Sequence, residues 1–353
     1  MDGFAAIRVQ AVAGREEEMK ALVVGGGSIG SRHLRNLNQL GVEHLGVVET
    51  DVSRRATLAA GTPATGFSTL QEGLDWAPHF VVVATPTHLH AEQTLEIVRA
   101  GFPVFVEKPL SHSPAGVREI SDLVSRTKLV SLVACNMRFH PGPAKVKRLV
   151  DEGRLGRILF ARIHTGSYLP EWRPNTDYRS NYAARVESGG GCIMDCIHEI
   201  DLARWYLGEV QSVFCCAGHL SSLEIETEDV AIVVCRHTRG AVSEIHLDYV
   251  QRTYERGCQI VGELGSIFWD FNAKSVRWYS APEKKWTTYP QAEAWEMNQM
   301  YMDEMKHFLD CLAERHPTTL PIPEAAELMG VVFAAKESAS QGRMIAVGGN
   351  SPE

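Results

Sequence analysis

The chain has 353 residues, 44% of them apolar and 22% charged, and its formal net charge is −8. A chain of this length needs more than one ordinary hydrophobic core, so we expect two domains. The acidic balance, without a basic block, argues against a nucleic-acid partner. No apolar run is long enough to span a bilayer and the N-terminus lacks a secretory leader pattern, so we expect a cytoplasmic protein with no membrane partner.

The first part of the chain alternates short apolar runs with helical patterns. Residues 1–18 have no clear period and form an expected N-terminal appendage. The apolar runs that follow are KALVVGG, HLGVVE, FVVVAT, PVFVEK and LVSLVACN, and helical patterns cover 28–40, 52–60, 88–100 and 114–127. Strands that alternate with helices predict a doubly wound parallel sheet in an α/β domain, residues 19–140.

The pattern changes beyond residue 140. A helix that prolines begin and Gly153 ends marks the junction. Strand patterns with short turns follow, among them GRILFARIHTG, EDVAIVVCRH and AVSEIHLDYV, and they predict an antiparallel sheet with one face packed on helices. Helical patterns at 293–313 and 323–338 complete an α+β second domain, residues 141–353.

The eight cysteines do not have the spacing of a disulfide framework. Those in apolar or strand-like segments are Cys135, Cys192, Cys196, Cys235 and Cys258. We therefore expect reduced, buried thiols.

A glycine-rich turn lies between the first strand and the first helix. In LVVGGGSIGSRHLRNL, Gly25, Gly27 and Gly30 occupy the G-x-G-x-x-G positions. Small residues there let the backbone approach a pyrophosphate, and the helix N-terminus offers free N–H groups. We expect Gly25, Gly27, Ser28, Ile29 and Gly30 to bind a dinucleotide, the alternative being a structural turn.

An acidic residue follows at the distance that such a site requires. Glu49 lies nineteen residues after Gly30, at the end of the run LGVV. Its carboxylate would accept hydrogen bonds from the adenosine ribose and repel a 2′-phosphate, which favours NAD over NADP. Arg54 and Arg55 are close in sequence, so NADP stays possible; Arg54 is itself a candidate cofactor contact.

Two further turns follow predicted buried strands, one after the run FVVV and one after the run PVFV. Because the carboxyl ends of parallel strands line the ligand crevice, we expect cofactor contacts at both turns and on the helix and strand beside them. Lys108 ends the run PVFV and would be partly desolvated, so its ammonium needs either a partner, with Glu107 as the structural alternative, or a chemical role. His90 lies on the following helix; the alternative to a cofactor contact is that it is only a helix-capping or surface histidine. The expected contacts are Ala84, Thr85, Pro86, His90, Glu107, Lys108 and Asn136.

SGGGCIMDCIHEIDLARWYLG places a titratable pair in an apolar helical run. Residues three or four apart share a helix face, so Asp195 and His198 would point together, and Asp201 could reach His198 from the next turn. The alternatives are a satisfied core histidine with a capping aspartate, and a zinc site of Cys192, Cys196 and His198, which lacks a paired C-x-x-C.

Five of these sequence segments together resemble the motifs of a known protein family. GGGSIG, ATPTHLHAE, VEKPL, NMRFHP and GGGCIMDCIHEIDLARWYLG come in the order and approximate spacing of the glucose-fructose oxidoreductase, inositol dehydrogenase and rhizopine-catabolism (Gfo/Idh/MocA) family. The resemblance implies an N-terminal Rossmann domain and a C-terminal domain with an open, largely antiparallel sheet. It also implies NAD(P)-dependent chemistry on sugars, cyclitols or nucleotide sugars. We expect a homo-oligomer, a dimer or a tetramer.

By this resemblance Lys108 is similar to the family's catalytic lysine, and Asp195 and His198 to its aspartate and histidine. Many members place the histidine four residues after the aspartate, whereas DCIHEID resembles a subgroup with a gap of three; Asp201 is the rival for orienting the imidazole. His198 would take the hydroxyl proton, and Lys108 would stabilise charge on the reacting oxygen.

Substrate recognition is assigned to RFHPGP and to HTGSYLPEWRPNTDYRSNYAAR. Aromatic faces bind sugar rings and arginine forks bind carboxylate or phosphate, so we expect a sugar acid or nucleotide sugar; a solvated loop or subunit contact is the alternative. The expected contacts are Arg138, Tyr168, Trp172, Arg173, Arg179, Asp195 and His198. The sequence thus predicts an NAD(P)-dependent oxidoreductase, with an NADPH-linked keto-sugar reductase or a non-catalytic dinucleotide sensor as alternatives. The latter would not need Lys108, Asp195 and His198 together.

Overall fold

The computed structural model describes residues 18–348 except Pro174, so nearly all of the expected appendage 1–18 lies outside the described residues. The chain forms two compact units. Of the described residues, the first unit comprises 18–136 together with Met297–Ala326, and the second comprises Met137–Glu296 and 327–348. Reasoning from the sequence, with one boundary at residue 140, did not anticipate this return of the chain to the first unit.

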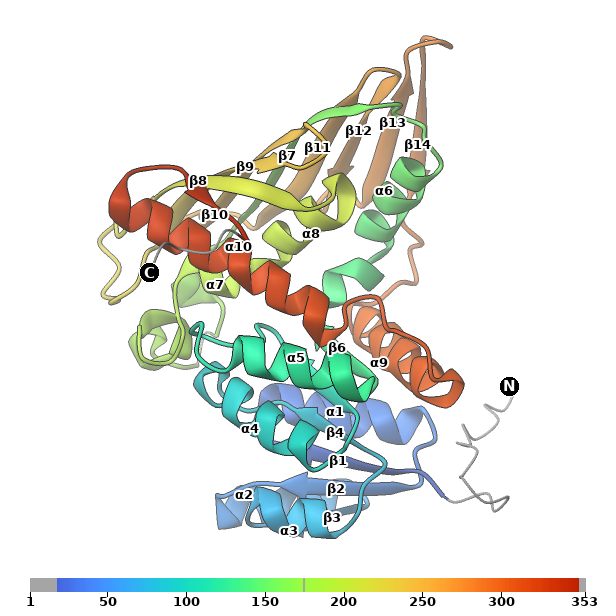
Figure 1. Ribbon diagram of the computed structural model, residues 1–353, viewed down its shortest axis with the longest axis vertical. Coiled ribbons are helices and arrows are strands. Elements are labelled where there is room, and N and C mark those ends of the chain that lie inside the picture. The colour runs from blue at the N-terminus through green and yellow to red at the C-terminus, as the bar shows by residue number, and fades with distance from the viewer. Residues whose placement is uncertain (1–17, 174, 349–353) are drawn as a thin grey trace. The chain divides into compact units, whose positions relative to one another are not determined.

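The first unit is a six-stranded parallel sheet in the order β3-β2-β1-β4-β5-β6 (Figure 1). This confirms the predicted doubly wound α/β domain. The strands are β1 Lys20–Val24, β2 His44–Val48, β3 Ala64–Phe67, β4 Phe80–Val83, β5 Val104–Glu107 and β6 Ser131–Ala134. The helices are α1 Ser28–Gln39, α2 Val52–Gly61, α3 Leu70–Asp75, α4 Thr87–Arg99 and α5 Val117–Thr127.

A helix from late in the chain completes the core of this unit. Helix α9, Met297–Glu314, packs beside α1 and β6. Its Phe308 ring lies 5.4 Å from the ring of Phe80 on β4 and 5.7 Å from that of Phe105 on β5, both edge to face, and all three side chains are fully buried. After the helix, the backbone N–H of Val133 on β6 donates to the Leu320 carbonyl at 3.0 Å.

The second unit is built on a nine-stranded sheet in the order β14-β13-β12-β11-β7-β10-β9-β8-β15. Among the described strands of this sheet only β7 and β10 pair in parallel, so the predicted mainly antiparallel sheet is confirmed. The strands are β7 Ile158–Gly166, β8 Val210–Gly218, β9 Val230–His237, β10 Val242–Asp248, β11 Glu255–Gly262, β12 Gly265–Asp270, β13 Ser275–Ser280, β14 Lys285–Pro290 and β15 Ile345–Ala346. The helices are α6 Pro141–Asp151, α7 Cys192–Asp195, α8 Ile197–Leu207 and α10 Ile322–Gln341.

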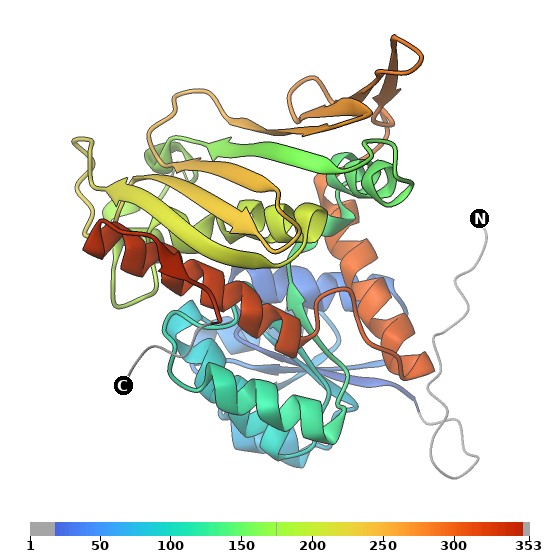
Figure 2. The ribbon, with the colours of Figure 1, turned by 45° about the horizontal axis from the view of Figure 1, so that its top comes forward.

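One face of this sheet packs on helices, and α8 contacts β7 and β10 (Figure 2). The other face carries no helix of the described chain, and burial alternates along β10 as a one-sided sheet requires. The uncovered face nevertheless includes apolar side chains that are more than a third exposed, namely Phe160, Phe214, Ile232 and Val242.

Two sequence-based expectations concern the whole chain. Within the described residues the cysteines form no disulfide, and the five named above are buried. No helix of the described part has the length and apolar character to cross a membrane. The cytoplasmic location stays a prediction.

Candidate functional site

The glycine turn after β1 is shaped for a ligand at one position and for packing at two others. A Cβ at Gly25, where φ is +99°, would lie 2.7 Å from the Ala84 carbonyl oxygen, and one at Gly30 would lie 1.8 Å from the Gly25 carbonyl oxygen. A Cβ at Gly27 would meet no described atom within 4 Å. The N-terminus of α1 therefore opens at Gly27 onto space that suits a pyrophosphate.

Glu49 holds this turn from the end of β2. Its carboxylate accepts hydrogen bonds from the Gly26 N–H at 3.0 Å and the Asp51 N–H at 2.9 Å, and it pairs with the Arg54 guanidinium at 3.1 Å. Burial alone would raise the pKa of Glu49, but these hydrogen bonds and the Arg54 charge lower it below the ordinary value. The side chain is anionic at neutral pH. Arg55 donates to the Glu49 backbone carbonyl, so both arginines stand beside the expected ribose position.

The end of β5 gathers polar groups from three other segments of the first unit. The buried His33 of α1 lies with Nε2 2.7 Å from the Glu107 carboxylate. Tyr301 of α9 hydrogen-bonds Asn136; burial and then the Glu107 charge raise the pKa of this phenol, against the opposing effects of Arg32, Asn136 and Lys108. Sequence reasoning missed His33 and Tyr301, although His33 lies on the helix that the glycine motif opens.

His90 has neither a cap nor a surface role. Its ring is 1% exposed and lies between two backbone carbonyl oxygens, with Nδ1 2.7 Å from that of Pro109 and Nε2 2.8 Å from that of Thr85. A direct contact between this ring and a cofactor would require the loss of one of these interactions.

In the second unit, the expected single helix through Asp195 and His198 is broken. Helix α7 ends at Asp195, Cys196 has φ −88° and ψ +32°, and α8 begins at Ile197. The two residues therefore do not share a face of one continuous helix. The break releases Asp195 to accept hydrogen bonds from the Tyr182 hydroxyl at 2.9 Å and from the Tyr249 hydroxyl at 3.4 Å.

The Tyr249 partner of Asp195 keeps its proton. Burial raises the pKa of Tyr249 well above its ordinary value and the Asp195 charge raises it further, so this phenol donates its hydrogen bond. Asp195 and His198 are 8% and 9% exposed. The Asp195 carboxylate thus accepts two phenol hydrogen bonds in a buried setting, three residues before His198.

Asp201, the rival partner for His198, is occupied elsewhere. Arg138 donates to both of its carboxylate oxygens, from Nε at 2.8 Å and from Nη2 at 2.6 Å, and both side chains are buried. Arg138 also lies over the ring of Trp205 at 5.2 Å. The expectation that Asp201 orients His198 is not supported by this pairing.

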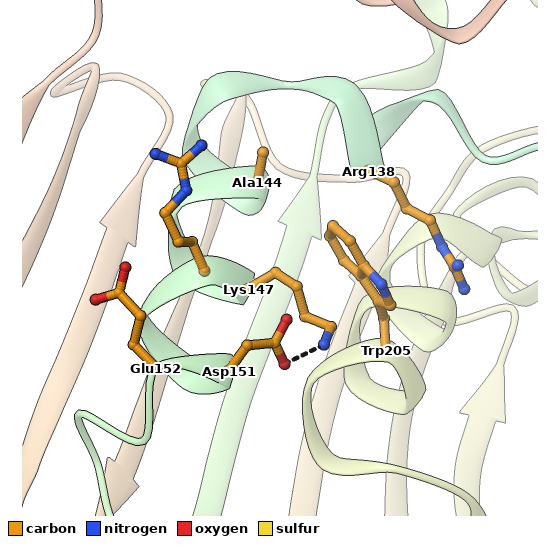
Figure 3. Close-up of a pocket in the computed structure, with 7 residues that line it drawn as sticks. Arg138, Ala144, Lys147, Asp151, Glu152 and Trp205 are labelled. Carbon is orange, nitrogen blue, oxygen red and sulfur yellow. Dashed lines mark hydrogen bonds and ion pairs between the residues drawn. The ribbon is translucent and has the colours of Figure 1, made fainter. Parts of the chain in front are cut away.

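A cavity of about 490 Å³ lies beside this ion pair, between α6 and α8 (Figure 3). Lys147 points across it to Asp151 on the same helix. The lining residues are Arg138, Ala144, Lys147, Arg148, Asp151, Glu152 and Trp205. Neither Asp195 nor His198 is among them, and opposite charges in the lining largely cancel, so we do not assign the chemistry to this cavity.

Two loops meet beside Asp195 because β7 and β10 end together. The Leu169 N–H donates to the Tyr249 carbonyl at 3.0 Å, and the Trp172 ring packs edge to face on the Tyr249 ring at 5.2 Å. Arg252 lies 3.7 Å from the centre of the Tyr168 ring. The structure thus brings the expected Tyr168 and Trp172 together with Tyr249 and Arg252, which sequence reasoning missed. The only feature that could have indicated this meeting is the parallel pairing of β7 with β10, and that pairing cannot be predicted from the sequence of either strand alone.

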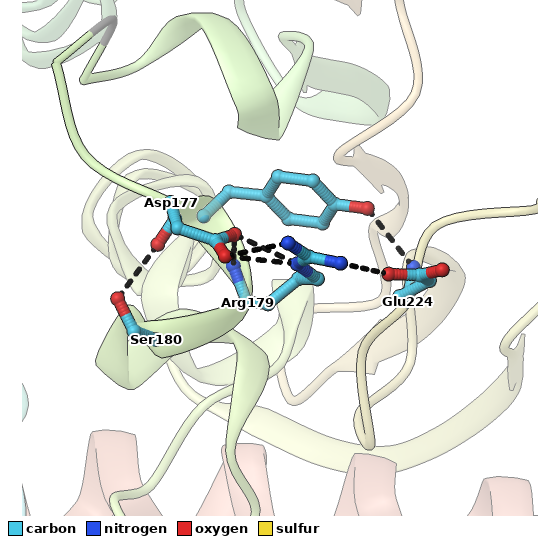
Figure 4. Close-up of polar contacts among 5 residues, drawn as sticks. Asp177, Arg179, Ser180 and Glu224 are labelled. Carbon is cyan, nitrogen blue, oxygen red and sulfur yellow. Dashed lines mark hydrogen bonds and ion pairs between the residues drawn. The ribbon is translucent and has the colours of Figure 1, made fainter.

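Arg173 and Arg179, two of the three arginines expected to bind substrate, differ in their surroundings. Arg179 lies between Asp177, at 2.8 Å, and Glu224, at 2.7 Å (Figure 4). Arg173 is exposed and lies 5.9 Å from the centre of the Tyr182 ring, which links it to the partner of Asp195. An anionic ligand at Arg179 would compete with two carboxylates.

The zinc alternative receives no support from the described residues. They contain no group of three or more His, Cys, Asp or Glu side chains placed to hold a metal ion. Burial raises the pKa of Cys192 well above its ordinary value, which disfavours the thiolate that zinc requires.

Comparison with known proteins agrees with this geometry. Residues 19–135 match the model of an oxidoreductase family with an NAD-binding Rossmann fold, and residues 144–268 match the GFO/IDH/MocA C-terminal domain. The chain is 31% identical to inositol 2-dehydrogenase 3 of Saccharopolyspora erythraea, over 69% of this chain and 71% of that protein. It is 25% identical to scyllo-inositol 2-dehydrogenase (NAD(+)) of Bacillus subtilis, over 93% and 96%.

A levoglucosan dehydrogenase solved in complex with NADH has the same fold, with a TM-score of 0.86 at 22% identity over 94% of this chain and 99% of that one. Fold and site together define a nicotinamide-dependent oxidoreductase. The chain belongs to the Gfo/Idh/MocA family, and its first unit is the NAD-binding domain.

The glycine turn can be tested with one pair of variants. Gly27→Ala adds a methyl group to open space, so the free energy of unfolding should stay within about 0.5 kcal/mol of the wild type while NAD affinity falls about tenfold or more. Gly30→Ala forces a methyl group against backbone and should lower the free energy of unfolding by about 1–3 kcal/mol. Urea unfolding and nucleotide titration measure both. If the Gly27→Ala protein bound NAD as tightly as the wild type, the pyrophosphate would not bind at Gly27.

Proposed function

We propose that this oxidoreductase transfers hydride to or from a hydroxyl- or keto-bearing carbon of a sugar-like substrate, with Lys108, Asp195 and His198 as its catalytic residues. The observation that carries the proposal is the buried Asp195 carboxylate, which accepts hydrogen bonds from two phenols where the aromatic loops meet. The relatives support the substrate class, since their names specify inositols, and a structural neighbour was solved with levoglucosan.

Each residue has a role that follows from its chemistry. When bound, the nicotinamide supplies the hydride acceptor or donor. His198 takes the hydroxyl proton as general base, and returns it in the reverse direction. Asp195 would offset the positive charge of the imidazolium that forms. Lys108 donates a hydrogen bond to the reacting oxygen and stabilises the charge that develops on it.

Substitution separates catalysis from cofactor binding. Lys108→Met and His198→Asn should each lower kcat by about two orders of magnitude or more, because each residue acts on transferring charge or proton. NAD affinity should stay within a few-fold of the wild type. Steady-state turnover and nucleotide titration of the folded variants provide the readouts. Unchanged turnover in both variants would remove the proposed mechanism.

We also propose that Glu49 makes NAD the preferred cofactor, and a second pair of variants tests this preference. Glu49→Gln keeps an acceptor for the Gly26 N–H but removes the charge, so it should narrow the preference for NAD over NADP. Glu49→Ala removes both and should weaken NAD binding as well. The affinities of both nucleotides for each protein are measured. A wild type that binds NADP more tightly than NAD would favour the NADPH-linked reductase instead.

The substrate, we further propose, carries a carboxylate or phosphate that Arg173 or Arg252 binds. Both guanidinium groups belong to exposed residues and stand over the aromatic rings of Tyr182 and Tyr168, close to the surroundings of Asp195. A ring that stacks on these aromatic side chains would present its anionic group to an arginine. Arg179 is the weaker candidate because two carboxylates already neutralise it.

Three alanine variants test this choice. Arg173→Ala or Arg252→Ala should raise KM for an anionic sugar about tenfold, since a charge-assisted contact is lost, and kcat should fall less. Arg179→Ala is the matched control on the same loop and should leave KM within about twofold. Anionic and neutral sugars are compared in steady-state assays. Equal efficiency on a neutral polyol, unaffected by any variant, would leave the arginines as surface residues.

A homo-oligomer stays a proposal. It is supported by the apolar side chains on the uncovered face of the nine-stranded sheet, which a second copy would remove from water. Sedimentation of the purified protein measures its state, and a monomer at micromolar concentration would contradict the proposal.

A further inference from the structure

His90 connects two turns of the NAD-binding unit through its ring nitrogens. The ring projects from the first turn of α4 and is fully surrounded by protein. Nδ1 faces the carbonyl oxygen of Pro109, which follows Lys108 directly, and Nε2 faces the carbonyl oxygen of Thr85 in the turn after β4. One side chain therefore contacts both the lysine turn and the turn that packs on the glycine loop.

The Thr85 side of this connection leads to the glycine loop. The Gly25 backbone approaches Ala84 and Thr85 so closely that a Cβ would lie 2.7 Å from the Ala84 carbonyl oxygen and 3.0 Å from the Thr85 methyl group. Helix α4 holds the same turn a second time, because the Thr85 hydroxyl donates to the Gln93 side chain at 2.6 Å. A shift of Thr85 would displace the backbone that faces the pyrophosphate.

The two contacts of His90 are chemically unequal at any moment. A carbonyl oxygen only accepts, and a neutral imidazole carries a single N–H, so a neutral ring donates to Pro109 or to Thr85 but not to both. Burial lowers the pKa of His90, against the two carbonyl contacts and the charge of Glu107, while Lys108 lowers it further. Glu107 and Lys108, both at the end of β5, are the charged groups that act on the ring among the described residues.

We propose that His90 is a positioning residue with two separable tasks that its two tautomers divide: with the proton on Nδ1 the ring donates to the Pro109 carbonyl and fixes the Lys108 turn, and with the proton on Nε2 it donates to the Thr85 carbonyl and fixes the cofactor loop. Neither task requires the ring to touch substrate or cofactor. The first task rests on the proposed catalytic role of Lys108, whereas the second rests only on the NAD-binding turn.

Three substitutions of His90 separate the tasks. The amide of asparagine occupies the place of Nδ1 and can donate to Pro109, whereas the amide of glutamine reaches the place of Nε2 and can donate to Thr85. Phenylalanine keeps a ring and donates to neither. His88→Asn is the matched control, because His88 is an exposed histidine on the same helix.

The expected result is a crossed pattern. His90→Phe should lower kcat about tenfold and weaken NAD binding about tenfold, since small displacements of positioned groups are costly. His90→Asn should restore kcat but not NAD affinity, and His90→Gln should restore NAD affinity but not kcat. Steady-state kinetics, nucleotide titration and thermal unfolding are compared with those of His88→Asn, which should match the wild type.

Two outcomes would overturn the inference. Equal losses of kcat and NAD affinity in all three variants would make His90 merely structural, and wild-type behaviour of the folded His90→Phe protein would make both contacts irrelevant. If His90→Phe does not fold, the asparagine and glutamine variants still decide between separable and common effects. Lys108→Met is measured in parallel. If Lys108→Met retains turnover, the proposed catalytic role of Lys108 is wrong. The NAD affinities of the His90 variants then still test the second task, the positioning of the cofactor loop.

Discussion

The common carboxyl edge of the six parallel strands is the constraint on which the NAD-binding unit depends. Because all six strands run in the same direction, the residues that follow them emerge on one side of the sheet. The glycine turn, Glu49, the Thr85 turn and Lys108 therefore become neighbours without any long-range signal in the sequence. Close backbone packing then refines the arrangement, and the approach of Gly25 to Ala84 allows no side chain at that point.

In the second unit, one parallel strand pair in an otherwise antiparallel sheet brings loops together in a similar way. β7 and β10 run in parallel within a sheet that is otherwise antiparallel, so the loops that follow both strands leave at the same edge. Tyr249 and Trp172 meet there, and the break at Cys196 turns Asp195 toward the phenols. A regular antiparallel meander would have sent these loops to opposite edges.

Local patterns were sufficient for the two sheets, because strand and helix periods and glycine turns act over a few residues, but they did not predict the return of α9 to the first unit. Contacts set by tertiary packing could not be predicted in this way. Arg179 pairs with Glu224, 45 residues away, and nothing near Arg179 in the sequence indicates that partner. The break after Asp195 was also missed, since Cys196 is a residue without strong helix-breaking character. The roles of Lys108, Asp195 and His198 stay predictions; the structure shows the buried Asp195 carboxylate with its two phenol donors.

The place of α9 in the first unit bears on the order in which the protein can be made. Phe308 contacts Phe80 and Phe105, yet it is synthesised after the eight strands β7–β14 of the second unit. During translation the NAD-binding unit therefore lacks part of its aromatic core until the strands of the second unit and then α9 have been synthesised. A helix synthesised late thus completes the core of the unit whose six strands are synthesised first.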